Sequence, residues 1–306
     1  MSGSDGGGQG HPAVTPYLKP QEFPPPSATV KVAFGADSRR GRSRTVNEDH
    51  YLILRLGRHQ ETLLTSLPDD VIGTRFDEYG YAMVVADGVG GTGPGEGASH
   101  LAIATLVYLV RHFGRWDLRV DNAIAREIME RVERFYRHVD STVVHERRKD
   151  AARASQTTLT AAFSAGRDLF FAHVGHSRAY LFRRGRLMRL TRDHTTTGGQ
   201  PATSPARLVD VTAAARDLSH ILTDTIGMNG STGPTIDVEH VQLDDHDRVL
   251  VCTNGLTDTV DEPMMAQVLA EPHAPSVQCQ ALVDLAMARG GEDDVTACVA
   301  WYRIPE

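Results

Sequence analysis

The sequence predicts an α+β fold built from antiparallel strands, and three observations lead to that prediction. Between residues 157 and 191 the chain becomes a series of short apolar runs joined by the glycine-bearing turns AGRD, GHS and RRG, which are typical of β-hairpins. Helical segments occur in two separate pairs, one before and one after this region. No internal repeat is visible, and the hairpins leave no room for a regular alternation of strand and helix.

A buried strand and two helices are predicted in the first half of the chain. The Val-rich run from Tyr81 to Asp87 is bounded by glycines, as a buried strand should be. It leads through a glycine-rich loop into a helix predicted over 96–114, where Gly114 marks the C-terminal end. In the following segment apolar residues recur at steps of three or four, which predicts a second helix with one apolar face: Ile124, Ile128, Val132, Phe135, Val139 and Val143.

The second half of the chain is predicted to contain two more helices between two strands. An apolar run over 247–253 predicts a strand that ends in the tight turn NGL. Helices are predicted over 263–270 and 276–289, the second with Ser276 at its N-cap. The chain then closes on an apolar strand over 293–304.

Composition excludes several classes of protein. The 306 residues are 41% hydrophobic, enough for a substantial core, and the net charge of -7 lacks the basic excess of nucleic-acid binders and polybasic membrane anchors. Three cysteines without a CxxC pair argue against a disulfide scaffold or a thiolate zinc site, and predict buried free thiols. The longest apolar run, 101–110, is too short to span a bilayer. We therefore expect a cytoplasmic protein that binds neither nucleic acid nor membrane.

Two regions are distinguished by their patterning. Residues 1–28 combine Gly, Ser and Pro with almost no periodic apolar positions, so they are predicted to form a disordered arm. Residues 29–306 carry all the predicted strands and helices, and we expect them to form a single domain.

The glycine-rich loop after Asp87 could hold nucleotide phosphates or a metal ion. Gly88, Gly90 and Gly93 match GxGxxG between a strand and a helix, which is the local context of a dinucleotide site. That site also needs a second buried parallel strand after the helix, and the stretch RWDLRVDN is too polar and short to supply one. A P-loop is excluded because no Lys-Ser or Lys-Thr closes the loop.

Acidic residues at several strand ends favour the metal ion. Asp87 ends a strand at a glycine turn, Glu48 and Asp49 precede the apolar run HYLILRLG, and Asp293 and Asp294 open the last strand. Hard divalent cations such as Mg²⁺ and Mn²⁺ prefer oxygen ligands of this kind. Together the five carboxylates predict a metal site.

At these residues the sequence resembles the metal-dependent serine/threonine phosphatases of the protein phosphatase 2C (PPM) family, in their compact bacterial form. The resemblance extends from about residue 30 to residue 304 and rests on six blocks in the family's order: GRSRTVNED, VVADGVGGTGPGEGAS, TTLTAAF, FAHVGHSRAYLFRRGRLMRLTRDHT, RVLVCTNGLTD and EDDVTACVA. It implies a four-layer α-β-β-α fold, in which helices flank a central sandwich of two antiparallel sheets. It also implies hydrolysis of phosphoserine and phosphothreonine by direct attack of a hydroxide that bridges two Mn²⁺ or Mg²⁺ ions.

The resemblance assigns roles to individual residues. Asp87 would bridge the two metals, with the Gly88 carbonyl and Glu48 on one side and Asp293 on the other. Glycine is needed after Asp87 because a backbone carbonyl reaches a cation only where no side chain blocks the turn. Arg44 matches the family's phosphate-binding arginine. The resemblance also implies that two further aspartates accept hydrogen bonds from metal-bound water: Asp49 and Asp258.

Two departures from the family pattern remove negative charge. Asn254 stands where the family usually has an aspartate ligand, so we expect weaker metal occupancy on the Asp293 side. His176 replaces the aspartate associated with an additional, weaker metal site, and it could bind a softer cation or serve no ligand role. Asp294 stands where asparagine is usual, and we expect it to restore part of the missing carboxylate charge.

These departures leave a second class of function open, a catalytically weak or inactive pseudophosphatase that binds phosphorylated partners. The intact Glu48, Asp87, Gly88, Asp293 and Arg44 favour the active enzyme. We expect a monomer that acts on phosphoproteins made by a Ser/Thr kinase, by family analogy alone. The loop over 195–220, rich in Gly, Pro, Ser and Thr, lies where the family has a flap beside the cleft and is expected to influence substrate choice.

Overall fold

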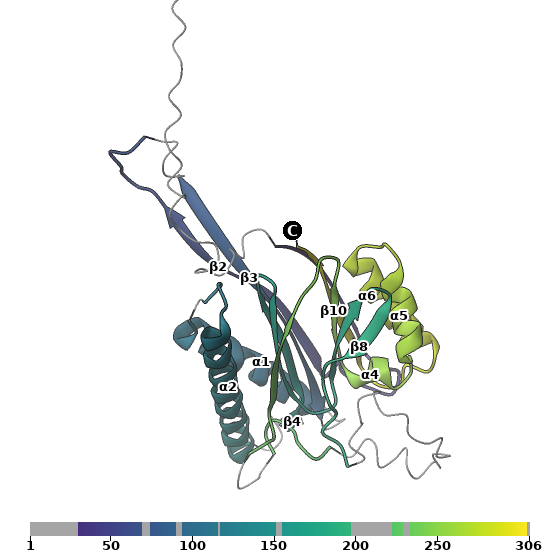
Figure 1. The fold of residues 1–306 in the computed structure, drawn as a ribbon. Helices are drawn as coiled ribbons and strands as arrows, with labels where there is room; N and C mark the ends of the chain where they lie inside the picture. The colour runs from purple at the N-terminus through teal and green to yellow at the C-terminus, as the bar shows by residue number, and fades with distance from the viewer. Residues whose placement is uncertain are drawn as a thin grey trace, which may run out of the picture.

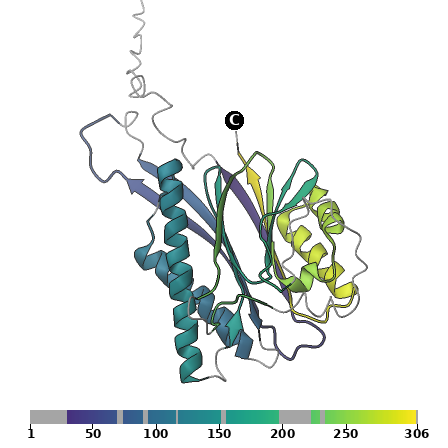
Figure 2. The ribbon, with the colours of Figure 1, turned by 60° about the horizontal axis from the view of Figure 1, so that its bottom comes forward.

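Two antiparallel β-sheets pack face to face in the computed structural model, and helices cover the outer face of each (Figures 1 and 2). The structure describes residues 30–68, 74–89, 94–115, 117–150, 155–196, 222–228 and 233–304. The α+β prediction and the four-layer α-β-β-α arrangement are confirmed. The predicted arm over 1–28, most of the glycine-rich loop after Val89 and most of the predicted flap lie outside the described residues.

The first sheet pairs the two ends of the domain. Its edge strand β1 lies antiparallel to β11 along their full lengths, with Lys31 opposite Arg303 and Arg39 opposite Val295. The strand order is β1 (Lys31–Arg39), β11 (Val295–Arg303), β10 (Arg248–Cys252), β7 (Arg178–Arg183) and β8 (Arg186–Arg189).

The second sheet carries the longest strands. Its first two strands form a hairpin that extends beyond the rest of the sandwich (Figure 1). The strand order is β2 (Asp49–Glu61), β3 (Arg75–Val89), β5 (Leu159–Ala165), β6 (Asp168–Val174) and β9 (Asp237–Gln242), and the short β4 (Gln156–Thr157) pairs with the end of β3.

The helices form the two outer layers. α1 (Pro94–Phe113) and α2 (Asn122–Lys149) cover the second sheet, and α5 (Glu262–Ala270) and α6 (Pro275–Ala288) cover the first, after the short α4 (Asn254–Thr257) (Figure 1). The α2 apolar face predicted from periodicity packs on the second sheet, where Tyr136, Val139 and Val143 are fully buried.

Three layers of apolar contacts hold the sandwich together. Met83, Val85 and Leu181 belong to the cluster between the sheets, whereas separate clusters lie under α1 with α2 and under α5 with α6. All three cysteines are free and buried, as predicted: Cys252, Cys279 and Cys298. Among the described residues, no helix is both long enough and apolar enough to cross a membrane.

The structure corrects the interpretation of the GHS turn. AGRD and RRG do close hairpins, but GHS joins β6 of the second sheet to β7 of the first. Both strands are buried on both faces, so their sequences resemble those of hairpin strands and do not reveal the change of sheet. Gly175, with φ of +113°, makes the change of direction, and a Cβ there would lie 2.6 Å from the Thr158 side chain.

Two helix predictions also differ from the structure. α6 begins with Ala274 at the N-cap and Pro275 in its first turn, so the N-cap predicted at Ser276 is wrong. Proline suits this position because its fixed φ matches a helix start and its missing N–H would be unpaired there. The predicted tight turn NGL belongs to α4, a single helical turn that begins at Asn254.

Candidate metal centre

The predicted site residues gather at one end of the sandwich, where β2 begins and β3 ends. The antiparallel register places Asp49 directly opposite Asp87, and the Gly88 N–H donates to the Glu48 carbonyl at 3.2 Å. The side chains of Glu48, Asp49 and Asp87 are all buried. One strand pair thus brings together residues that are about forty positions apart in the sequence.

The backbone of Asp87 is fixed by two threonines. Its N–H donates to Thr158 Oγ1 at 3.0 Å, and its carbonyl accepts from the Thr158 N–H at 2.9 Å and from Thr157 Oγ1 at 2.9 Å. Thr158 Oγ1 also lies 2.7 Å from Ser177 Oγ. The side chain of Asp87 therefore projects from a rigid frame.

Two further threonines hold Asp49. Its Oδ2 accepts from Thr253 Oγ1 at 2.8 Å and from Thr296 Oγ1 at 2.7 Å. Its Oδ1 is buried and has no hydrogen-bond partner among the residues that the structure describes. Burial raises the pKa of Asp49 to about 7, although the two threonine hydrogen bonds oppose the rise and the neighbouring Asp294 and Asp293 add to it.

Glycines allow the backbone to approach Glu48 and Asp87 closely. A Cβ on Gly95, at the start of α1, would lie 2.7 Å from Glu48 Oε2, and a Cβ on Gly88 would lie 2.4 Å from the Gly95 carbonyl. Ser99, one turn further along α1, donates from its hydroxyl to the Glu48 carbonyl at 2.6 Å. At Gly88 and Gly95 the backbones of β3 and α1 approach too closely to leave room for a side chain, which is a physical reason for glycine at both residues.

The segment before β11 contributes two acidic residues with different roles. Asp293 is half-exposed and pairs with Arg44, whose Nη2 and Nε lie 2.6 Å and 2.7 Å from Asp293 Oδ1. Asp294 is buried, and its two oxygens accept from the backbone N–H groups of Gly41 and Glu48, each at 2.8 Å. Asp294 thus fixes the chain that carries Arg44 and Glu48, a role that the sequence did not indicate. Its predicted contribution to metal charge stays a prediction.

Arg44 brings positive charge into this acidic cluster. Besides Asp293 it faces Glu48, with Nη1 4.0 Å from Oε2. Burial by itself lowers the pKa of Arg44, but the attraction of Asp293 outweighs it, so the pKa lies above its ordinary value. The Arg44 guanidinium thus faces two of the predicted metal ligands, Glu48 and Asp293. Its contact with a substrate phosphate stays a prediction.

The amide of Asn254 is oriented by Asp258. Asn254 Nδ2 donates to Asp258 Oδ2 at 3.0 Å, across one turn of α4. The other amide atom, Oδ1, is buried and without a hydrogen-bond partner in the described part of the chain. An acceptor oxygen that is held in place and left free is suited to coordinate a cation.

His176 lies beside the strand-end carboxylate. Its Nδ1 is 3.8 Å from Asp87 Oδ2, and the side chain is largely buried. His176 lies here because the GHS turn connects the two sheets and does not close the hairpin that we predicted. The predicted choice between a ligand role and no ligand role stays open.

The electrostatics of the cluster favour a bound cation. Burial raises the pKa of Asp87 well above its ordinary value, and repulsion from Asp49 and Asp293 adds to the rise, whereas Arg44 opposes it. Burial also raises the pKa of Asp294. A divalent cation would relieve both the repulsion and the desolvation of these carboxylates.

The residues have the donor atoms that a metal ion needs, although they do not form a complete coordination site in this structure. Two buried oxygens, Asp49 Oδ1 and Asn254 Oδ1, lack partners within the described ranges, and oxygen is the donor that Mn²⁺ and Mg²⁺ prefer. No group of three or more His, Cys, Asp or Glu side chains in those ranges is already gathered closely enough to hold a metal. The ion pair of Asp293 with Arg44 is one physical reason.

The hydroxyl residues that fix the site were not predicted from the sequence. All five lie within the sequence blocks that resemble the family, and this position was the one indication that the sequence offered: Thr157, Thr158, Thr253, Thr296 and Ser99. Hydroxyl side chains are common in strands and at helix starts, so this signal alone does not distinguish them.

Comparison with known proteins agrees with the geometry. A sequence model of the protein phosphatase 2C family matches residues 65–287. The chain is similar to the serine/threonine protein phosphatase PstP of Mycobacterium tuberculosis, with 29% identity over 223 residues that cover 71% of this chain and 40% of PstP. It is also similar to the serine/threonine phosphatase stp of Listeria monocytogenes, with 28% identity over 215 residues that cover 70% of this chain and 81% of stp. The chain thus spans less than half the length of PstP.

Solved structures show the same architecture. The catalytic domain of PstP in complex with two manganese ions aligns with a TM-score of 0.64 and 27% identity, over 90% of this chain and all of that domain (100%). The serine/threonine phosphatase of S. agalactiae aligns with a TM-score of 0.69 over 89% of this chain and 99% of its own. At 22% identity the second comparison supports the fold alone.

Proposed function

Because the chain belongs to the protein phosphatase 2C family, we propose that it is a metal-dependent protein serine/threonine phosphatase. The observation that carries the proposal is the cluster of buried carboxylates at the start of β2 and the end of β3, whose charge is only partly balanced by Arg44. Such a concentration of buried acids is costly without a cation. The two manganese ions of the similar PstP domain support a binuclear centre.

We assign the ligands by the resemblance to the family. Asp87 would hold both ions, with Glu48 and the Gly88 carbonyl on one side and Asp293 and Asn254 on the other. The hydrogen bond from Asn254 Nδ2 to Asp258 supports the assignment, because it leaves the Asn254 oxygen available to a cation. Bound Mn²⁺ or Mg²⁺ supplies a water activated for attack on phosphorus and neutralises the displaced phosphate oxygens.

The remaining residues position these ligands and the substrate. Asp49, held by Thr253 and Thr296, offers its free Oδ1 as an acceptor for a proton of ordered water. Arg44 would bind the phosphate oxygens of the substrate through paired N–H groups when Asp293, its partner in this structure, serves as a metal ligand. No side chain is required as a covalent nucleophile.

Two departures from the family pattern favour the second candidate, a weak or inactive pseudophosphatase. Asn254 gives the Asp293 side a neutral ligand in place of a carboxylate, and His176 removes a further negative charge near Asp87. Lower charge reduces affinity for a dication, and a third, weaker metal site is therefore expected to need still higher metal concentrations.

The proposed substrates are phosphoproteins made by a Ser/Thr kinase, and the proposed working form is a monomer.

Phosphate release from a phosphothreonine peptide tests the proposal. The purified protein is titrated with Mn²⁺ and with Mg²⁺, beside Asp87→Asn and a matched control, Asp284→Asn, at an exposed aspartate on α6. We expect metal-dependent turnover in the wild type and the control, and at least about a hundredfold less in Asp87→Asn, because removal of a bridging charge affects both ions. Absence of turnover at millimolar metal, with the fold intact and phosphopeptide still bound, would support the pseudophosphatase instead.

A further inference from the structure

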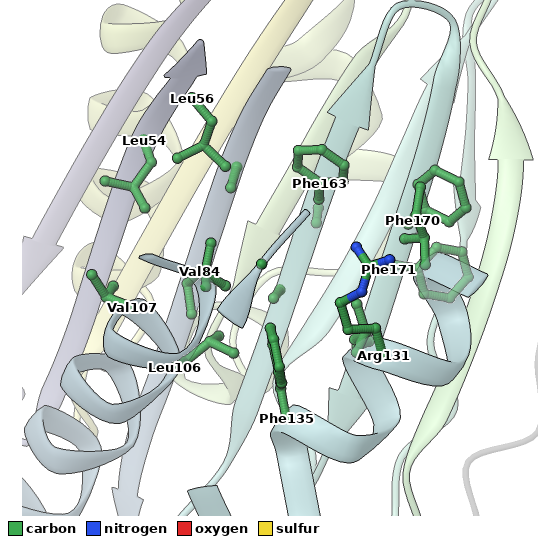
Figure 3. Close-up of a pocket in the computed structure, with 18 of the residues that line it drawn as sticks. Leu54, Leu56, Val84, Leu106, Val107, Arg131, Phe135, Phe163, Phe170 and Phe171 are labelled. Atoms are coloured by element: carbon green, nitrogen blue, oxygen red, sulfur yellow. The ribbon is translucent and has the colours of Figure 1, made fainter. Parts of the chain in front are cut away.

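An apolar cavity lies between the second sheet and the helices α1 and α2, apart from the acidic cluster. It has a volume of about 130 Å³, and none of the predicted metal or phosphate ligands lines it. Its walls are aliphatic and aromatic side chains from β2, β3, β5, β6 and both helices (Figure 3). Val110 and Gly114, at the end of α1, are half-exposed, whereas Tyr136 is fully buried, so the cavity is deep and has an edge near solvent.

A cavity of this size is unusual in a protein interior. Cores are packed as densely as organic crystals, with few voids larger than a water molecule. An apolar cavity of about 150 Å³ in another protein stays free of water and binds benzene. The cavity beside α1 and α2 has a similar volume, so it suits an apolar molecule of about six to nine non-hydrogen atoms.

Two arginines line this apolar space, Arg115 at its exposed edge and Arg131 deeper inside. Arg131, on α2, is 8% exposed, and Figure 3 shows its guanidinium extending towards the sheet, where Phe163 and Phe170 lie opposite each other on the face that α2 covers. Its ion pairs with Glu127 at 2.9 Å and with Asp117 at 3.5 Å both use Nη2. Nε and Nη1 form no hydrogen bond with the residues that the structure describes, and neither belongs to the fully buried atoms that lack a partner. Both N–H groups can therefore donate to an acceptor that enters the cavity.

The charges around Arg131 indicate a neutral ligand. Arg115 pairs with Glu127 at 2.6 Å, so two arginines face two acidic side chains, Asp117 and Glu127, at this edge of the cavity. Their formal charges cancel. A ligand carboxylate would add an unbalanced negative charge beside apolar walls, whereas a carbonyl oxygen accepts the same N–H groups without that cost.

We propose that this cavity binds a small neutral molecule with an apolar, preferably aromatic, body and one carbonyl-type acceptor that receives hydrogen bonds from Arg131. The aromatic preference follows from the rings of Phe135, Phe163 and Phe170, which line the space. The site is independent of the proposed phosphatase activity, since it shares no residue with the acidic cluster.

Calorimetric titration of the 306-residue chain with three probes of similar size tests the proposal. The probes are acetophenone, which has the acceptor, ethylbenzene, which lacks it, and benzoate, which adds a negative charge. We expect acetophenone to bind most tightly. Arg131→Met keeps the apolar stem and removes the donors, and should weaken acetophenone by about tenfold or more while changing ethylbenzene by less than about twofold.

A cavity-filling variant locates the binding. Ala161, on β5, lines the cavity, so Ala161→Leu should abolish binding of acetophenone and ethylbenzene. The matched control is Ala104→Leu on the exposed face of α1, which should bind both probes as the wild type does. Far-ultraviolet circular dichroism confirms that each variant is folded. If Arg131→Met does not fold, the proposal is tested by two other results: the preference of the wild type for acetophenone over ethylbenzene, and the loss of binding in Ala161→Leu.

Three results would overturn the proposal. They are no detectable binding of any probe at its solubility limit, equal binding by Ala161→Leu and the wild type, and tighter binding of benzoate than of acetophenone. The last would show that the cavity edge selects an anion, contrary to the charge balance of the four side chains.

Discussion

Raising the pH should destabilise the metal-free protein, because the buried environment of Asp49 favours the protonated form of its carboxyl group. Burial raises the pKa of Asp49 from 3.8 to about 7 in the folded chain. Between these two values the folded state keeps a proton that the unfolded state has lost. Stability therefore falls as pH rises through this window, and the loss is complete above the folded pKa.

The magnitude follows from the size of the pKa difference. One pKa unit corresponds to about 1.4 kcal/mol, so the rise from 3.8 to about 7 corresponds to about 4 kcal/mol for Asp49 alone. Neutral Asn at this position cannot titrate, so Asp49→Asn should lose this part of the pH dependence. Bound Mn²⁺ should offset the same cost, and should raise the melting temperature more at pH 8 than at pH 5.

Urea unfolding in the presence of a chelator measures this effect. The free energies of unfolding of the wild type, Asp49→Asn and the exposed control Glu130→Gln are compared at pH 5 and pH 8. About two pKa units lie between pH 5 and the folded pKa of about 7, so the wild type and the control should lose about 3 kcal/mol more than Asp49→Asn. Parallel losses in all three proteins would refute the assignment of the pH dependence to Asp49.

Three further substitutions test the surroundings of the site. Thr253→Val removes a hydroxyl that donates to Asp49, and should weaken Mn²⁺ binding by about tenfold in a calorimetric titration; unchanged affinity would remove Thr253 from the account. Gly88→Ala places a Cβ 2.4 Å from the Gly95 carbonyl, and should lower the free energy of unfolding by about 2 kcal/mol and reduce turnover; wild-type stability would contradict the close approach. Arg44→Lys loses the paired N–H groups, and should raise the KM for phosphopeptide by about tenfold with a smaller change in kcat; an unchanged KM would rule out a phosphate contact.

Much of the fold was predictable from local patterns. The apolar face of α2 repeats at helical spacing, and the hairpins at AGRD and RRG have apolar runs on both sides of a glycine turn. The path at GHS was not predictable in this way, because β6 and β7 are buried on both faces whichever sheet they join. Only the packing of the two sheets decides that Gly175 leads from one to the other.

The candidate site was predictable in its residue types more than in its contacts. Glu48, Asp49 and Asp87 stand at strand ends in the sequence, and strand pairing brings them together. The contact of Arg44 with Asp293 was not predictable, because it depends on how the segment before β2 lies against the segment before β11. Likewise, nothing in the sequence distinguishes Asp294 as the acceptor for two backbone N–H groups.

Anomalous diffraction at the manganese edge, from crystals grown with Mn²⁺, tests the central claim most directly. We expect two peaks beside the Asp87 carboxylate, one towards Glu48 and Gly88 and one towards Asp293 and Asn254. The second peak should be weaker because Asn254 is neutral, and both peaks should disappear in Asp87→Asn. A map without a peak beside Asp87, or with manganese bound only elsewhere on the protein, would contradict the assignment of a metal centre to this cluster.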